Sequence, residues 1–192
     1  MVNIKTKIFC DFDGVIVDSI ERIVTLYNYD FQYYEDFKYV LPENVQTYGF
    51  EECNCADKYY LNDYFNQKRF FDGLKLMPNA YSTLRKLAIK NDITIVSSGY
   101  IPNLRAKEVY IKKYLPFCEF IGVDLNKYLD KSHIDMCGGI IIDDSAQNLK
   151  TSNAKYKLCF GKIYPWNAEW VYKGAWMDNW DEVREYIEKE IN

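Results

Sequence analysis

The stretch IFCDFDGV, residues 8–15, joins an apolar run to two aspartates and a glycine. The apolar residues predict a buried strand, and Asp11 and Asp13 follow at its carboxyl end. Residues i and i+2 of an extended chain point the same way, so both carboxylates can face one small volume. Gly14 then permits a sharp turn. Two carboxylates in one place suit a divalent cation and offer a nucleophile beside a proton donor.

Apolar runs that predict buried strands recur along the chain, with helical patterns between them. The runs are 8–12, 93–96, 120–123, 139–142 and 157–160. Helical periodicity is found around residues 80–88, 109–115 and 183–191. In the second of these, Val109 and the stem of Lys112 are expected to share the buried face, with 113–115 less cleanly. Strands that alternate with helices are typical of βα units. We therefore expect an α/β fold with a Rossmann-like, mostly parallel sheet flanked by helices, and ligands at the carboxyl ends of the strands.

The stretch from residue 20 to residue 72 interrupts this alternation. It has no convincing buried strand and is rich in aromatic side chains. We expect a small, mainly helical cap at 20–72, inserted after the first strand, and a catalytic core formed by 1–19 and 73–192. Most of the rings should form the cap's own core. Phe70 and Phe71 end the cap, and we predict that at least one of them binds substrate.

Composition excludes several classes of protein. The 192-residue chain has a net charge of −4, which argues against a polynucleotide partner because phosphates need a basic surface. No apolar run approaches the length of a membrane span, and residues 1–7 lack the apolar region of a signal peptide. We expect a cytoplasmic protein without membrane contact. The six cysteines and the single histidine, His133, do not have the spacing of a zinc site. The sequence does not determine the oligomeric state, and a homodimer is one of the open alternatives.

Polar residues near later strands complement the first aspartate pair. Ser97 and Ser98 follow the second apolar run, Lys131 precedes the fourth, and Asp143 with Asp144 closes it. Hydroxyl and ammonium groups bind phosphoryl oxygens, and a second acidic pair completes an oxygen-rich Mg²⁺ site. Each residue alone also has a structural explanation, since serines end strands and most lysines are solvated. Their joint order favours a site for phosphoryl transfer.

Two of the polar stretches also have the pattern of helix caps. Asp18 and Glu21 have capping-box spacing, which favours Asp18 as the first cap of a helix. Asp144 or Ser145 can cap the helix expected after the second acidic pair. These interpretations stand beside the functional ones.

At these residues the chain resembles the haloacid dehalogenase superfamily of phosphohydrolases. The motifs similar to its four are DFDGV at 11–15, Ser97, Lys131, and IIIDD at 140–144. True dehalogenases lack an acid at the second aspartate position, so Asp13 indicates phosphatase chemistry. The resemblance implies that Asp11 attacks phosphorus and that Asp13 acts first as acid and then as base. It also implies that Mg²⁺ is held by Asp11, the Asp13 carbonyl and Asp143, with Asp144 acting through water or from farther out.

A narrower similarity, over nearly the whole chain, is to the 5'(3')-deoxyribonucleotidase family. It rests on DFDGVIVDS (11–19), FFDGLKLMPNAYSTLRKL (70–87), IVSSGY (95–100), DKSHIDMCGGIIIDD (130–144), LCFGKIYPWN (158–167) and WMDNWDEV (176–183). The resemblance implies a Rossmann-like core with a small helical cap, and Mg²⁺-dependent removal of phosphate from nucleoside monophosphates. Ser145 is a departure, because the family usually has arginine after its paired aspartates.

The expected function is therefore that of a Mg²⁺-dependent phosphomonoesterase acting on nucleoside monophosphates through a phosphoaspartate. The nearest alternative is a phosphatase of the same superfamily for another small phosphate ester or a nucleic-acid 3' phosphate. A catalytically silent binding protein on the same fold is the alternative from a different class.

Overall fold

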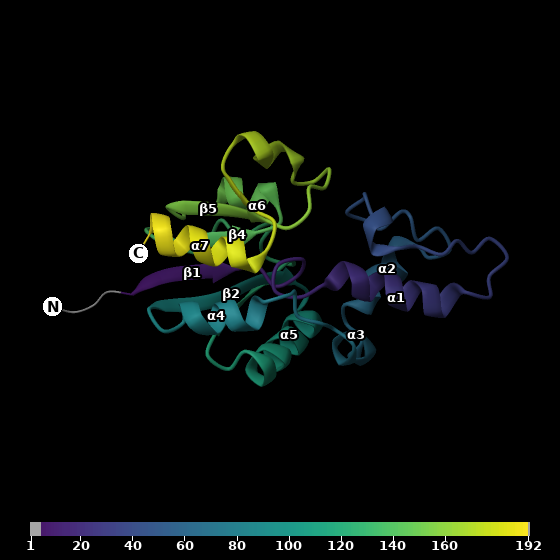
Figure 1. Ribbon diagram of the computed structural model, residues 1–192. Helices are drawn as coiled ribbons and strands as arrows, with labels where there is room; N and C mark the ends of the chain where they lie inside the picture. The colour runs from purple at the N-terminus through teal and green to yellow at the C-terminus, as the bar shows by residue number, and fades with distance from the viewer. Residues whose placement is uncertain (1–4, 192) are drawn as a thin grey trace.

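The computed structural model describes residues 5–191. Its centre is a parallel sheet of six strands, and Figure 1 shows this sheet between its flanking helices. The strand order is β3-β2-β1-β4-β5-β6. The strands are β1 (Thr6–Cys10), β2 (Asn91–Gly99), β3 (Glu119–Asp124), β4 (Ile140–Asp143), β5 (Tyr156–Phe160) and β6 (Ala175–Met177). Each of the five predicted strands overlaps an observed strand, and their ends differ by at most three residues. The predicted α/β fold is confirmed, and β6 is an additional short strand at the edge.

The register of the central strands aligns their carboxyl ends. Cys10 of β1 lies opposite Ile95 of β2 and Ile142 of β4. The Asp11 amide donates to the Ile142 carbonyl at 2.9 Å, which extends this pairing by one residue. Because the strands are parallel and buried on both faces, they are nearly continuous apolar runs. The polar residues that follow them therefore meet at one edge of the sheet.

Helices cover both faces of the sheet. One face carries α4 (Ala80–Leu87), α5 (Ile101–Tyr114) and α7 (Trp180–Glu190). The other carries α6 (Ala146–Thr151) and the 3₁₀ helix Ala168–Tyr172. None of the helices in residues 5–191 is long and apolar enough to cross a membrane.

The predicted buried face of the helix around residues 109–115 is wrong. Val109 is 68% exposed, whereas α5 buries Leu104, Lys107, Tyr110 and Ile111. The buried face thus contains a lysine that the apolar pattern did not include. Its partners lie on other elements of the fold and are described with the site below.

Residues 20–72, called the cap segment from here on, contain only helices and connecting loops. The helices are α1 (Ser19–Phe31), the 3₁₀ helix Pro42–Asn44, α2 (Lys58–Tyr64) and α3 (Lys68–Asp72). Figure 1 shows α1, α2 and α3 beyond the carboxyl edge of the sheet. Asp18 is the N-cap of α1, since its Oδ1 accepts from the Glu21 amide at 2.8 Å.

The two chain connections between the sheet and the cap segment pair with each other. Asp18 donates its amide to the Lys75 carbonyl at 3.0 Å, and Met77 donates to the Ile16 carbonyl at 2.8 Å. Val17 forms an antiparallel bridge with Leu76. Entry to the cap segment and exit from it therefore lie side by side.

The packing of α7 on the loop after β1 leads to a prediction about stability. Trp180 is fully buried against Phe160, and its Nε1–H donates to the Val15 carbonyl at 2.9 Å. We expect Trp180→Ala to lower the free energy of unfolding by about 3–5 kcal/mol, because it leaves a large cavity. Trp180→Phe keeps much of the ring and should lose about 1–3 kcal/mol, chiefly through the unpaired carbonyl. Denaturant unfolding of both variants measures the difference, and equal losses would contradict this account.

Candidate active site

The predicted site residues of the core meet at the carboxyl edge of the sheet. Asp11 and Asp13 follow β1. Ser97 and Ser98 lie in β2, just before its last residue, and Asp143 ends β4. Lys131 comes from the segment between β3 and β4, and Asp144 follows β4 directly. All of these residues except Asp143 line one cavity of about 480 Å³. Asp143 is fully buried and is bonded to Lys131.

Lys131 joins the two acidic strand ends. Its Nζ donates to Asp11 Oδ1 at 2.7 Å and to Asp143 Oδ2 at 2.6 Å. Lys131 and Asp143 are almost completely buried. Burial by itself would lower the pKa of the Lys131 ammonium, but the charges of Asp11 and Asp143 outweigh it and hold the pKa above its usual value. Lys131 is therefore a fixed positive charge beside Asp11.

Asp143 of the second acidic pair is held by the start of α6. Asp143 Oδ1 accepts from the Ser145 amide at 2.9 Å and from Asn148 Nδ2 at 3.1 Å. Ser145 is the N-cap of α6, which is one of the two caps considered from sequence. Burial, reinforced by the charges of Asp11 and Asp143, raises the pKa of the Asp144 carboxyl well above its usual value. An added cation would relieve this repulsion.

Three carboxylates have the arrangement of a metal site. Asp11, Asp143 and Asp144 each offer an oxygen, and these oxygens lie within 4.8 Å of one another. Hard carboxylate oxygens are the ligands that Mg²⁺ and Ca²⁺ prefer, and no histidine or cysteine belongs to this group in residues 5–191. The donor set fits Mg²⁺.

Charge balance leads to the same conclusion. The four aspartates that follow or end β1 and β4 bring four carboxylates, while Lys107 and Lys131 bring two ammonium groups. With every group ionised, two negative charges remain without a partner. A divalent cation would neutralise them, and buried charges are stable only when they are paired in this way.

Lys107 of α5 belongs to the site although its sequence position did not suggest it. Its Nζ contacts Asp13 Oδ2 at 2.5 Å, Ser97 Oγ at 2.8 Å and the Ser98 carbonyl at 3.1 Å. The side chain is 1% exposed. Burial raises the pKa of Asp13, while the nearby Lys107 charge acts in the opposite direction. A carboxyl with a raised pKa is suited to donate a proton.

The cap segment forms one wall of the cavity, and this wall carries no charged side chain. Its residues are Ile20, Thr47, Tyr48, Phe50, Asn62, Phe65 and Asn66. Opposite them, Trp166 lies in the loop after β5 and stacks on Tyr164 with ring centroids 4.2 Å apart. Tyr48 contacts Trp166 edge to face at 5.9 Å. The cavity thus has a charged floor at the sheet and an uncharged, partly aromatic wall above it.

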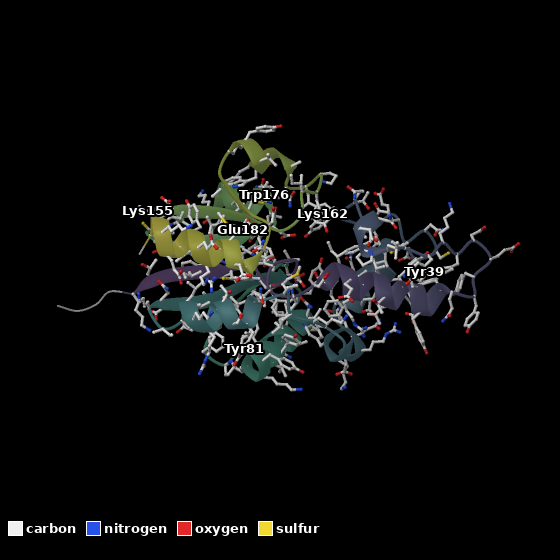
Figure 2. The ribbon with its side chains drawn as sticks, viewed as in Figure 1. Tyr39, Tyr81, Lys155, Lys162, Trp176 and Glu182 are labelled. Atoms are coloured by element: carbon white, nitrogen blue, oxygen red, sulfur yellow. The ribbon has the colours of Figure 1, made fainter. Side chains whose placement is uncertain are left out.

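The loop after β5 also bonds to the cap segment. Lys162 points from this loop toward the cap segment and donates to the Glu43 carbonyl at 3.0 Å (Figure 2). On the other side of the cavity, Asn103 Nδ2 donates to the Phe65 carbonyl at 2.6 Å. These contacts fix the aromatic wall above the acidic floor.

The predicted substrate-facing position of Phe70 and Phe71 is wrong. Neither residue lines the cavity. Phe70 is fully buried between Phe65 and Phe71, and Phe71 packs toward Tyr110 of α5. The two rings fill the junction between α3 and the core, where they remove apolar surface from water. Phe65 is the nearby ring that reaches the cavity.

The family comparison covers nearly the whole chain. The family model described as "5' nucleotidase, deoxy (Pyrimidine), cytosolic type C protein" matches residues 5–191. No curated protein sequence matches the chain.

Solved structures with the same fold are distant in sequence. A haloacid dehalogenase-like hydrolase from Streptococcus pneumoniae is 18% identical, with 95% of this chain and 98% of that chain covered and a TM-score of 0.67. A HAD family hydrolase from Deinococcus radiodurans with bound phosphate and sodium is 16% identical, with 95% of both chains covered and a TM-score of 0.66. A HAD-hydrolase from Bacillus subtilis bound to magnesium is 15% identical, with 97% of this chain and 99% of that chain covered and a TM-score of 0.60.

Proposed function

Since the chain belongs to the family of 5' nucleotidase, deoxy (pyrimidine), cytosolic type C proteins, we propose that it is a Mg²⁺-dependent phosphomonoesterase that dephosphorylates nucleoside monophosphates. The resemblance to the haloacid dehalogenase superfamily is confirmed, and the chain has the family and fold of its phosphatases. The observation that carries the proposal is that Asp11, Asp13, Lys131 and Asp144 line one cavity, while Asp143 is bonded to Lys131. The cytosolic family description supports the expected cytoplasmic location.

Asp11 is the proposed nucleophile. Lys131 holds its Oδ1 and leaves the other oxygen for attack on phosphorus, which forms a phosphoaspartate. Asp13 protonates the departing oxygen as the P–O bond breaks. It then takes a proton from the water that hydrolyses the phosphoaspartate. Ser97 and Lys131 bind phosphoryl oxygens, which spread negative charge as the transfer proceeds.

Asp11, Asp143 and Asp144 would hold the Mg²⁺ ion, together with the Asp13 carbonyl. When bound, Mg²⁺ would offset the carboxylate charges and polarise the phosphoryl oxygens. The magnesium found with the related hydrolase from Bacillus subtilis supports this choice of ion.

The cap segment supplies the features expected of a nucleoside pocket. We propose that residues 20–72 form a cap that binds the substrate, on a core of 1–19 and 73–192. The cap wall has aromatic rings for a base and amide groups for its polar edge, and it has no charged side chain. A second phosphate or a carboxylate on the substrate would have no ionic partner there. This favours a monophosphate whose remaining part is neutral.

The cap wall leads to a prediction about substrate affinity. We expect Phe65→Ala to raise KM for nucleoside monophosphates about tenfold, because base stacking contributes about 1–3 kcal/mol. Glycerol phosphate has no base, so its KM should stay the same. Phe71→Ala is the matched control, since Phe71 does not line the cavity and its loss should lower thermal stability without separating the two substrates. Equal effects of Phe65→Ala on both substrates would rule out a stacking role.

A panel of phosphate esters tests the proposed function itself. Phosphate release would be measured with Mg²⁺ on 5' and 3' nucleoside monophosphates, both deoxy and ribo, on sugar phosphates, and on an oligonucleotide with a 3' phosphate. We expect the highest kcat/KM on a nucleoside monophosphate. A clear preference for a sugar phosphate or the oligonucleotide would overturn the nucleotide assignment and favour the alternative phosphatase. No release from any ester would favour a silent binding protein.

A further inference from the structure

The two buried lysines of the site differ in how many of their hydrogens are used. A lysine ammonium has three N–H donors. Lys107 directs them at three acceptors, Asp13 Oδ2, Ser97 Oγ and the Ser98 carbonyl, all within 3.1 Å. Lys131 has two acceptors within bonding distance, one on Asp11 and one on Asp143. Lys131 therefore keeps one hydrogen for a phosphoryl oxygen, whereas Lys107 keeps none.

The contact with Lys107 makes the two oxygens of Asp13 different. Oδ2 is bonded to the Lys107 ammonium. Oδ1 is buried and has no hydrogen-bond partner among residues 5–191. An unpaired buried oxygen is unfavourable, and most such atoms in folded proteins find partners. Among residues 5–191, the bond from Lys107 to Oδ2 is therefore the side-chain hydrogen bond that holds this carboxyl.

We propose that Lys107 is a positioning residue: it bonds to Oδ2 and so keeps the Asp13 carboxyl in the orientation that serves the departing oxygen of the substrate. The inference rests on the proposed function. Lys107 is well placed to hold this geometry, since it is 1% exposed and its Nζ lies 5.5 Å from the centre of the Phe12 ring, in the loop that carries both aspartates. A buried, fully bonded side chain keeps its partner in one orientation.

The role of Asp13 predicts for which substrates the loss of Lys107 slows the first step of the reaction. In the first step a bond forms between Asp11 and phosphorus, the P–O bond to the alcohol breaks, and the proton on the Asp13 carboxyl goes to the alcohol oxygen. In the second step water attacks phosphorus, its proton goes to Asp13, and Asp11 is released. A nucleoside alkoxide is strongly basic and needs the proton, but a nitrophenolate leaves without it. Loss of Lys107 should therefore harm the first step for nucleotides more than for nitrophenyl phosphate.

The test compares kcat/KM for a nucleoside monophosphate and for p-nitrophenyl phosphate, because kcat/KM reports the steps up to departure of the alcohol. For Lys107→Met we expect the loss on the nucleotide to exceed the loss on the aryl ester by at least about tenfold, within the range of general acid catalysis. Lys131→Met is the matched control. Lys131 acts on the nucleophile and the phosphoryl group, so its loss should lower both values by the same factor. Equal losses for Lys107→Met would overturn the inference.

Lys107→Gln repeats the comparison with a residue that keeps a donor, and thermal unfolding checks that each variant is folded. The unaltered protein offers a test that needs no variant, namely its crystal structure with fluoroaluminate, a mimic of the phosphoryl group in transfer. We expect the Asp13 carboxyl beside the fluoroaluminate and Lys107 still on Oδ2. Lys107 Nζ bound to the fluoroaluminate in place of Asp13 would overturn the inference. An unaltered protein that is inactive on both esters would instead overturn the proposed function, and the inference with it.

Discussion

Asp11→Asn is expected to reduce phosphate release by at least about four orders of magnitude while the protein stays folded. The amide cannot form a phosphoaspartate, and it replaces one of the two charges that hold Lys131. Phosphate release and thermal unfolding measure the two properties separately. Asp124→Asn is the matched control, because Asp124 is also a largely buried aspartate at a strand end but does not line the cavity. It should keep its turnover.

The companion variant Asp13→Asn separates attack from proton transfer. It keeps the nucleophile, so an ester with a good leaving group should still form phosphoenzyme, which would then persist because water is not activated. Asp11→Asn should form none. Normal turnover by a folded Asp11→Asn protein would end the mechanism proposed here.

Removal of divalent cations is expected to abolish activity, and Mg²⁺ should restore it better than Zn²⁺. The reason is the set of hard oxygen ligands and the two negative charges that the lysines leave unpaired. Asp143→Ala should weaken the dependence of the rate on Mg²⁺ more than Asp144→Ala does. Asp143 is the deeper ligand, held by the Ser145 amide and by Asn148.

The measurement is a Mg²⁺ titration of the rate after treatment with a chelator and its removal. Each variant is compared by the Mg²⁺ concentration that gives half of its own maximal rate, which separates metal binding from losses in turnover. Full activity in metal-free buffer would contradict the site.

The sheet could be predicted because its central strands are buried on both faces. Such strands must be continuous apolar runs, and five of them stand out in the sequence. β6 (Ala175–Met177) could not be recognised in this way, because it has three residues and lies at the sheet edge. The face of α5 was mistaken because it buries Asn103 and Lys107, whose polar groups are satisfied by distant parts of the chain.

The acidic floor of the cavity could be predicted from the sequence, because parallel strands bring their carboxyl ends together. The other contributions depend on tertiary contacts. Lys107 meets Asp13 across 94 positions of sequence. The sequence contained one indication that Lys107 is buried. It has the helical spacing of Leu104 and Ile111 and so shares their buried face of α5. The choice between Phe65 and Phe70 as the ring that reaches the cavity depends on how α3 packs against the core, which no local pattern contains.

The pairing of the two connections at Val17 and Leu76 has a consequence for how such a protein can evolve. The chain leaves the core and returns to it at one place, through hydrogen bonds among residues 16–18 and 75–77. A segment with adjacent ends can be lengthened, shortened or exchanged with little strain on the scaffold that receives it. New substrate preferences can therefore arise by exchange of residues 20–72 while the aspartates, the lysines and the six strands are inherited unchanged.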